Sequence, residues 1–166
     1  MDRTVFGEMR HLVRLTVVVI ALLVVALAGC ETVDTAAAGR AAASQATRSE
    51  PPGNYFVGRR MYKVDYKVWG WVREPGRPWS TAKLVMLNEQ RKLAPDRAQG
   101  KLGVDNDYEY RLSGFFSGDT VYEPASNGFY PEFILLGAEV RSTKPLNIYQ
   151  QERQRDPKVR ILQPPS

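Results

Sequence analysis

The stretch Tyr108–Phe116, with the sequence YEYRLSGFF, decides the fold of this chain. Its residues alternate between two faces, one of which carries Tyr108, Tyr110, Leu112, Gly114 and Phe116. The other face carries Glu109, Arg111, Ser113 and Phe115. A repeat of two residues predicts a half-buried β-strand, because successive side chains of a strand point to opposite sides of the sheet.

The same alternation predicts strands on both sides of this stretch. Residues 62–73 alternate throughout, and residues 82–87 form a more deeply buried run, with a Pro-Gly turn between the two. A short piece at 120–122 and a long run at 129–140 follow, and Asn127-Gly128 between them predicts a hairpin. Pro131 has no N–H to donate to a ladder, so we expect it at the start or the free edge of the last strand.

Three of these strands carry an interior glycine, at Gly70, Gly114 and Gly137. Glycine weakens a strand unless the strand bends or another chain segment approaches closely, so repeated glycines favour a small closed barrel over a flat sheet. Five strands, with the longest loop at residues 89–107, resemble an OB-fold, a small five-stranded barrel. The predicted fold class is therefore all-β, an antiparallel five-stranded barrel, and a β-sandwich is the alternative, although it needs more strands.

Residues 1–29 have the layout of an export signal. Arg3, Arg10 and Arg14 precede an apolar run, Leu15–Leu27, that is shorter than the ~20 residues a membrane-spanning helix needs. The run ends in Leu27-Ala28-Gly29-Cys30, which resembles the lipobox of bacterial lipoproteins. This resemblance implies cleavage before Cys30 and membrane anchoring by a diacylglyceryl group on its sulfur and an acyl group such as palmitate on its amine.

The residue after the lipobox cysteine bears on the destination of such a lipoprotein. In this family an Asp there usually retains the protein in the inner membrane, and this chain has Glu31. The resemblance therefore implies an outer-membrane anchor, with the domain facing the periplasm.

Composition divides the rest of the chain into three parts. Residues 30–53 begin with the lipidated cysteine and are otherwise rich in Ala, Gly, Ser and Thr, and we predict a flexible linker there. Residues 54–149 contain all three Trp and all eight Tyr, so the β-barrel domain and its core must lie there. Residues 150–166 are charged and Gln-rich, which predicts a disordered tail with residues 159–162 as a candidate strand.

The residue types that remain after processing restrict the chemistry. The only histidine, His11, belongs to the signal, and the only cysteine, Cys30, takes the lipid. A Ser-His-Asp site, a Cys-His site and a zinc site with nitrogen or sulfur ligands are therefore excluded, and we predict a protein that is not an enzyme. No glycine-rich phosphate loop is present, so we expect no nucleotide cofactor, and we expect no metal.

Two other roles compete with a binding protein. Carboxylates alone suffice for a hydrolase of cell-wall glycans, since that chemistry needs two acids facing each other across a cleft. A structural part of an outer-membrane assembly is the third role, which stable co-purifying partners would reveal.

Aromatic residues on the nominally polar face of residues 62–73 give the best candidate binding surface, because that face should be hydrated. Flanking cations would help such aromatics to bind a protein or a sugar. The alternative is that a loop or the C-terminal segment covers the tryptophans, or that the barrel tilts so that both faces of the strand pack. The predicted surface comprises Lys63, Lys67, Trp69, Trp71, Arg73 and Trp79.

The net charge of +5 is mild, and acidic residues are interspersed among the basic ones. Nucleic-acid binding requires a concentrated basic face, so we expect no nucleic-acid partner. The expected partners are the membrane, through the lipid, and a protein or glycan of the envelope. The oligomeric state stays open.

Overall fold

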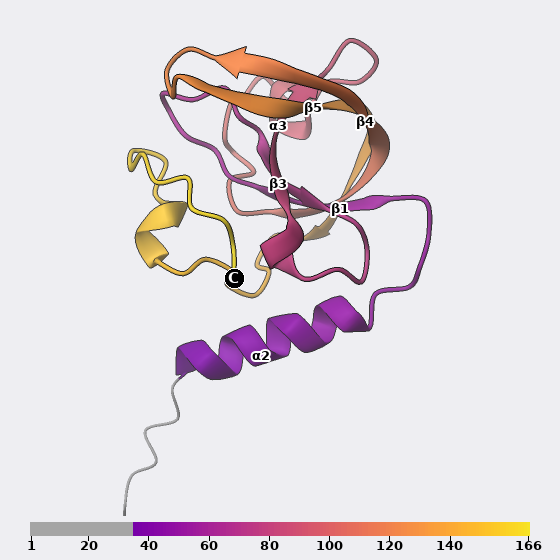
Figure 1. Cartoon of the computed structure of the whole chain (residues 1–166), viewed down its shortest axis with the longest axis vertical. Coiled ribbons are helices and arrows are strands. Elements are labelled where there is room, and N and C mark those ends of the chain that lie inside the picture. Colours follow the sequence, from indigo (N-terminus) through magenta and orange to yellow (C-terminus); the bar gives the residue numbers. More distant parts are fainter. Residues whose placement is uncertain (1–34) are drawn as a thin grey trace, which may run out of the picture. The chain divides into compact units, whose positions relative to one another are not determined.

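The computed structural model describes residues 35–166, so the signal segment and Cys30 lie outside the described residues (Figure 1). No helix in this described part is long and apolar enough to cross a membrane. The elements in chain order are α2 (Thr35–Arg48), β1 (Phe56–Arg60), β2 (Gly70–Arg73), the 3-10 helix η1 (Trp79–Thr81), β3 (Lys83–Asn88), α3 (Pro95–Ala98), β4 (Glu109–Glu123), β5 (Gly128–Ser142) and the 3-10 helix η2 (Glu152–Arg155).

The strands close into a barrel in the order β1-β2-β3-β5-β4, which confirms the predicted five-stranded barrel. Neighbouring strands are antiparallel except β3 and β5, which pair in parallel. The sheet is therefore mixed and not purely antiparallel as predicted. The reason is that β3 does not join its spatial neighbour directly: the chain first crosses through α3 to β4, and the tight hairpin then brings β5 back beside β3.

The predicted strands differ in how well they match. The run at 82–87 corresponds to β3 and the run at 129–140 to β5, whereas the two predicted pieces at 108–116 and 120–122 are one strand, β4, interrupted by a bulge. The run at 62–73 is wrong for most of its length. Residues 61–69 form an irregular hairpin with a single bridge between Lys63 and Tyr66, and β1 lies before them.

The interior of the barrel is filled by side chains from all five strands. Phe56 of β1 packs at its margin, and Trp69, from the residue before β2, also belongs to this cluster. The buried members contributed by the strands themselves are Val72, Val85, Tyr110, Leu112, Phe133 and Leu135. Since every strand contributes, this cluster is the inner core.

A second apolar cluster contains residues from only three neighbouring strands, Val57 of β1, Trp71 of β2 and Leu84 of β3. It therefore lies on the outer face of these strands, and we call it the outer core. Ala43 of α2, Trp79 of η1, and Ile148 and Tyr149 near the C-terminal end of the described residues complete it.

The linker and the tail are more ordered than predicted. Residues 35–48 form α2, of which Ala43 and Thr47 are buried, so the prediction of a flexible linker is wrong for this part. Hydrophobicity did not reveal this helix, because alanine gives only a weak amphipathic pattern. The predicted disordered tail is also wrong: Gln154 is fully buried, and the N–H of Ser166 donates to the carbonyl of Ile148 at 3.1 Å.

Candidate functional site

The structure does not expose the surface predicted from residues 62–79. Trp69, Trp71 and Trp79 are only 2%, 4% and 5% exposed, and Lys63 and Arg73 are buried as well. Of the six predicted residues only Lys67 is exposed. The predicted binding surface is therefore wrong, and the alternative, in which other segments cover the tryptophans, is confirmed for Trp71 and Trp79 by their place in the outer core.

Gly70 separates two tryptophans that strict alternation would place on one face. Trp71 lies opposite Arg59 and packs in the outer core, where its indole N–H donates to the sulfur of Met61 at 3.4 Å. Trp69 precedes the regular strand and turns into the inner core, where its ring occupies the space beside Gly58. A side chain on Gly58 would lie 2.9 Å from this ring.

Arg59 and Lys63 hold the C-terminal segment over the outer core. Arg59 donates to the carbonyl of Leu146 at 2.8 Å, pairs with Asp107, and lies 5.7 Å from the ring centre of Tyr149. The Lys63 ammonium donates to the backbone carbonyls of residues 154 and 156 at 2.5 and 2.9 Å. Burial lowers the pKa of Lys63. These cations fasten the chain's own backbone, so they are not open to a ligand.

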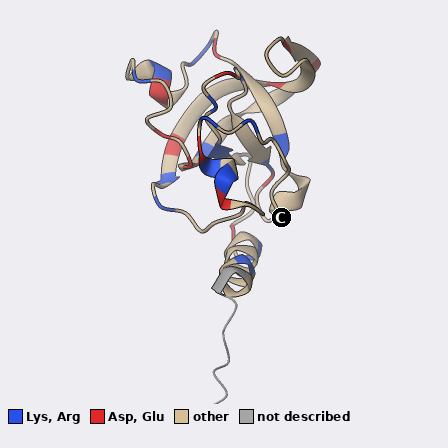
Figure 2. Ribbon diagram, turned by 90° about the vertical axis from the view of Figure 1, so that its left-hand side faces the viewer, with Lys and Arg blue, Asp and Glu red and all other residues tan. Residues whose placement is uncertain are grey.

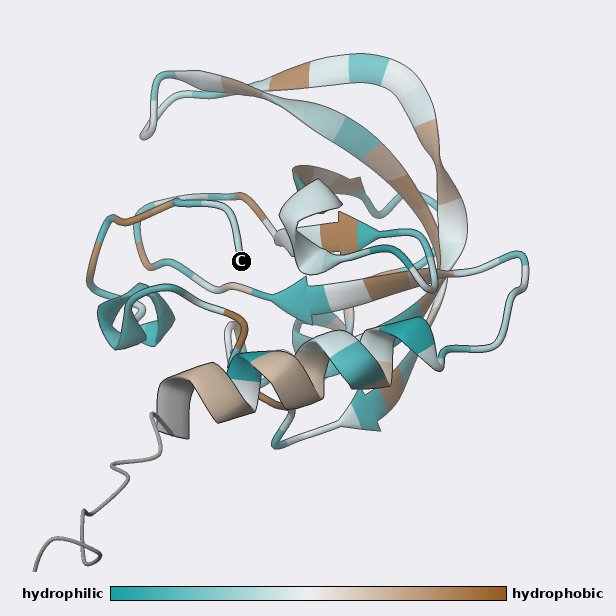
Figure 3. Cartoon of the chain, turned by 60° about the horizontal axis from the view of Figure 1, so that its bottom comes forward, coloured by the Kyte–Doolittle hydropathy of each residue, from teal (hydrophilic) through white to brown (hydrophobic). Residues whose placement is uncertain are grey.

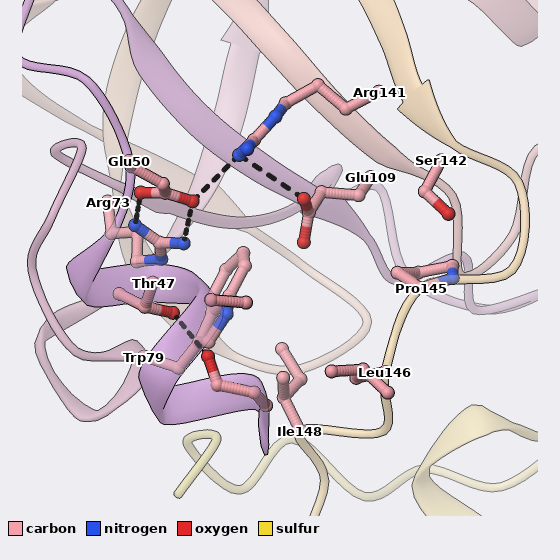
Figure 4. A pocket seen from close by; sticks show the side chains of 12 residues that line it. Thr47, Glu50, Arg73, Trp79, Glu109, Arg141, Ser142, Pro145, Leu146 and Ile148 are labelled. Carbon is pink, nitrogen blue, oxygen red and sulfur yellow. Dashed lines mark hydrogen bonds and ion pairs between the residues drawn. The ribbon is translucent and has the colours of Figure 1, made fainter. Parts of the chain in front are cut away.

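Glu50, just beyond α2, joins the helix to the barrel by two arginines (Figure 4). Its carboxylate accepts two hydrogen bonds from Arg73, at 2.7 and 2.8 Å, and one from Arg141 at 2.8 Å. Arg141 also lies 3.3 Å from Glu109. A cavity of about 140 Å³ lies beside this cluster, lined by it and by apolar side chains.

The pKa of Glu50 reflects this pairing. Burial alone would raise the pKa, but the hydrogen bonds from Arg73, Arg141 and the N–H of Gly76 outweigh burial and lower it to about 2. A carboxyl group that stays ionised to such a low pH cannot serve as a general acid near neutral pH. The cluster therefore acts as a clamp between α2 and the barrel, with Arg73 also lying 4.3 Å from the ring centre of Trp79.

We expect Glu50→Gln to lower the free energy of unfolding by about 3 kcal/mol at pH 7, because Arg73 would remain buried without a charged partner. In the wild type, the contribution of Glu50 is complete above pH 4.5 and is lost as the pH falls toward 2, since the folded-state pKa is depressed. Urea unfolding between pH 2 and pH 7 would measure both effects, and the variant should lack this pH-dependent component.

Glu74→Gln is the matched control. Its ion pair with Arg77 spans 3.8 Å between side chains that are 67% and 69% exposed, so we expect a change of less than ~1 kcal/mol. Equal losses of unfolding free energy in Glu50→Gln and Glu74→Gln would contradict the role of Glu50 in fastening α2 to the barrel.

Arg60, the last residue of β1, belongs to a network of buried charged side chains. Its guanidinium is 2.9 Å from Asp96 and 3.5 Å from Asp105, and the Tyr110 hydroxyl donates to Asp105 at 2.9 Å. Burial raises the pKa of Asp105, whereas the pKa of Asp96 is lowered because Arg60 and two backbone N–H groups outweigh its burial. Arg60, Asp96 and Asp105 do not line any of the three cavities described for residues 35–166.

The long hairpin of β4 and β5 carries five exposed large apolar side chains. The exposed large aromatic residues among the described residues, Phe115, Tyr122 and Phe129, belong to it, together with Leu136 and Val140. Hydrophobic segments recur along both of its strands (Figure 3). We call these five residues the arm surface, although they do not share one face, since Val140 lies opposite the inward-pointing Tyr110 and Phe115 lies on the other face. The sequence contained a signal for it, since Phe115 falls on the polar face of the alternating stretch.

The tip of the arm surface is built by the predicted turn. Asn127 adopts a positive φ of 50°, which closes the hairpin and sets Tyr122 opposite Phe129. Their ring centres are 5.2 Å apart, and the Tyr122 hydroxyl donates to the Asn127 side chain at 2.9 Å. Phe129 is nevertheless 70% exposed, so this aromatic pair is prearranged but left uncovered.

The second open feature is a cavity of about 400 Å³ at one end of the barrel, which we call the mouth. It lies where β1 begins, β2 ends and β3 begins, and Phe56 and Phe116 line it together with Lys83. Basic and acidic residues are otherwise interspersed over the domain, as Figure 2 shows.

Comparison with known proteins returned no relative. No protein-family model matches the chain, and neither does any curated protein or any solved structure. Groups of three or more His, Cys, Asp and Glu residues that could hold a metal ion do not occur within residues 35–166.

Proposed function

We propose that this chain is a lipid-anchored protein of the bacterial cell envelope, without catalytic activity, that binds a partner protein through the arm surface. The lipobox ending at Cys30 supports the anchor and the compartment. Removal of the signal with His11, and use of the only thiol for lipid, leave the domain without the usual nucleophile and base pairs.

The observation that carries the binding role is the concentration of exposed aromatic residues on one hairpin. Aromatic side chains that are rigid and already desolvated on one side are common energetic centres of protein interfaces. Residues 109–142, which form the hairpin, carry five carboxylates and two arginines. An acidic arm is repelled by an anionic lipid surface, so a protein with an apolar groove is the partner it fits.

The rival role, a carboxylate-dependent glycan hydrolase, finds less support. That chemistry needs one acid with a raised pKa opposite a second carboxylate. Glu50 and Glu109 line one cavity, but both pair with Arg141, and the pKa of Glu50 is lowered to about 2. This arrangement favours a structural clamp over a catalytic pair.

Photo-crosslinking in intact cells tests the proposal. A photoreactive phenylalanine analogue in place of Phe129 in the full-length chain should give a discrete protein adduct. Tyr122→Ala in the same chain should weaken this adduct at least tenfold, because truncating an interface aromatic costs about 2 kcal/mol. The same analogue at Lys92, which is exposed on the loop after β3, is the control and should give no such adduct.

The outcomes separate the parts of the proposal. Adducts only with lipid, or equal adducts from positions 92 and 129, would refute a protein-binding arm. Mass spectrometry of the N-terminal peptide of the processed protein should show lipid on Cys30, and an unmodified Cys30 would refute the lipid anchor.

A further inference from the structure

We infer that the mouth of the barrel is a binding site for a carboxylated sugar. This inference rests on the proposed function for the compartment, because the cell envelope is where such sugars occur. The site is separate from the arm surface, since none of the arm residues lines the mouth. Three features support this site: an aromatic floor, a rim with cations, and the difference from the other cavities of the described residues.

The floor is a fixed cluster of phenylalanines. Phe56 and Phe116 meet edge to face with ring centres 5.6 Å apart, and both pack edge to face on Phe133, at 5.2 and 5.3 Å. Phe133 is fully buried, whereas Phe56 and Phe116 are only half-buried and line the cavity. The outer two rings therefore have apolar surface to offer, and the inner ring holds them in place.

Rings of this kind suit the apolar face of a sugar. The C–H groups on one face of a pyranose carry slight positive charge, and the face of an aromatic ring is negative. A cavity of about 400 Å³ falls within the range of small-molecule sites, and it is large enough for one or two sugar rings. An extended polymer would have to enter by its end.

The rim supplies cations for a carboxylate. The Lys83 ammonium lies 4.9 Å from the ring centre of Phe116, and no carboxylate among the described residues forms an ion pair with it. Arg77 is largely exposed and pairs only loosely with Glu74, at 3.8 Å. The third cation, Arg73, is committed to Glu50. Lys83 and Arg77 are therefore the groups available to an incoming anion.

The other cavities lack this combination. The charged side chains that line the cavity beside the clamp, Glu50, Arg73, Glu109 and Arg141, pair with one another. The cavity near Ser166 is lined by small and polar side chains with Trp79 and Arg40, and Arg40 already has an interaction within the chain. Aromatic floor and available cations coincide only at the mouth among the cavities described for residues 35–166.

A matched pair of sugars tests the inference. N-acetylmuramic acid and N-acetylglucosamine share a ring and differ in the lactyl carboxylate, so their dissociation constants for the full-length lipidated protein in detergent isolate the charge. Saturation-transfer NMR should show the acid binding at least ten times more tightly. Lys83→Ala should abolish this preference, and Lys101→Ala, a change of an exposed lysine in the loop before β4, should keep it.

The remaining outcomes are decisive as well. Absence of binding, equal binding of the two sugars, or a preference that survives Lys83→Ala would each overturn the inference. Galacturonic acid carries a carboxylate but no lactyl group, so its binding tells a general acid-sugar site from one that recognises the lactyl group. Crosslinking from position 129 is independent of these measurements, so failure at the mouth and failure of the arm can be told apart.

Discussion

Replacing Arg60 with methionine is expected to lower the free energy of unfolding by about 3–5 kcal/mol, because two carboxylates would remain in the barrel wall without their cation. Asp96 is fully buried and Asp105 is 1% exposed, so water cannot replace the guanidinium. Arg60 also donates to the carbonyls of Val68 and Trp69, and of these the Trp69 carbonyl would keep the N–H of Met61 as a donor. Urea unfolding followed by circular dichroism would measure the loss.

A compensated variant tests whether charge is the cause. Adding Asp96→Asn and Asp105→Asn to Arg60→Met removes the uncompensated charges, and it should recover a large part of the lost stability. The difference in unfolding free energy between Arg60→Met and the wild type should also narrow as the pH is lowered. In the variant, burial without Arg60 should raise the pKa of Asp96 and Asp105 above their wild-type values, so these carboxyl groups become neutral at a higher pH than in the wild type. A triple variant no more stable than the single one would show that packing, and not charge, sets the loss.

Gly70→Ala is expected to prevent folding or to cost more than about 3 kcal/mol. A Cβ at this position would lie 2.1 Å from the carbonyl oxygen of Arg59 and 2.9 Å from the backbone nitrogen of Met61. Both atoms belong to backbone in the hairpin between β1 and β2, so neither can rotate away. Overpacking in a core costs 1–3 kcal/mol even where side chains can adjust.

Gly137→Ala is the matched control, because Gly137 also lies inside a barrel strand. Its nearest neighbour for a new Cβ is the Ser113 side chain at 3.5 Å, which is an ordinary contact. We expect a change within about 1 kcal/mol, measured in the same unfolding experiment. A cost at Gly137 equal to that at Gly70 would contradict the steric argument.

Patterns of alternation and turn residues were enough to predict much of the barrel. Residues 82–87 and 129–140 are apolar runs and form β3 and β5, and the Asn127-Gly128 turn joins β4 and β5. At two of the three interior glycines, Gly70 and Gly114, backbone does approach closely, since an added Cβ would lie 2.1 and 2.3 Å from a backbone carbonyl oxygen. These signals are local, which is why one sequence suffices to find them.

The candidate site was harder to predict because its exposure depends on distant segments. From the alternation in its own strand, the Trp71 side chain would face solvent. In the structure, residues near positions 43, 79 and 148, distant in the sequence, help to cover it. β1 escaped notice because Arg59 and Arg60 read as surface residues, although their charges are balanced by Asp107 and Asp96 far along the chain. Partners at such separations leave no periodic trace in the sequence.

The outer core also sets an order of events for a chain made from its N-terminus. Trp71 and Trp79 obtain their cover from Ile148 and Tyr149, so the tryptophans stay open to solvent until the last part of the chain has emerged. Such long-range closure slows folding, since the ends must meet before their contacts yield free energy. A chain that crosses a membrane unfolded would complete this layer only after its final residues have crossed, when release and folding coincide.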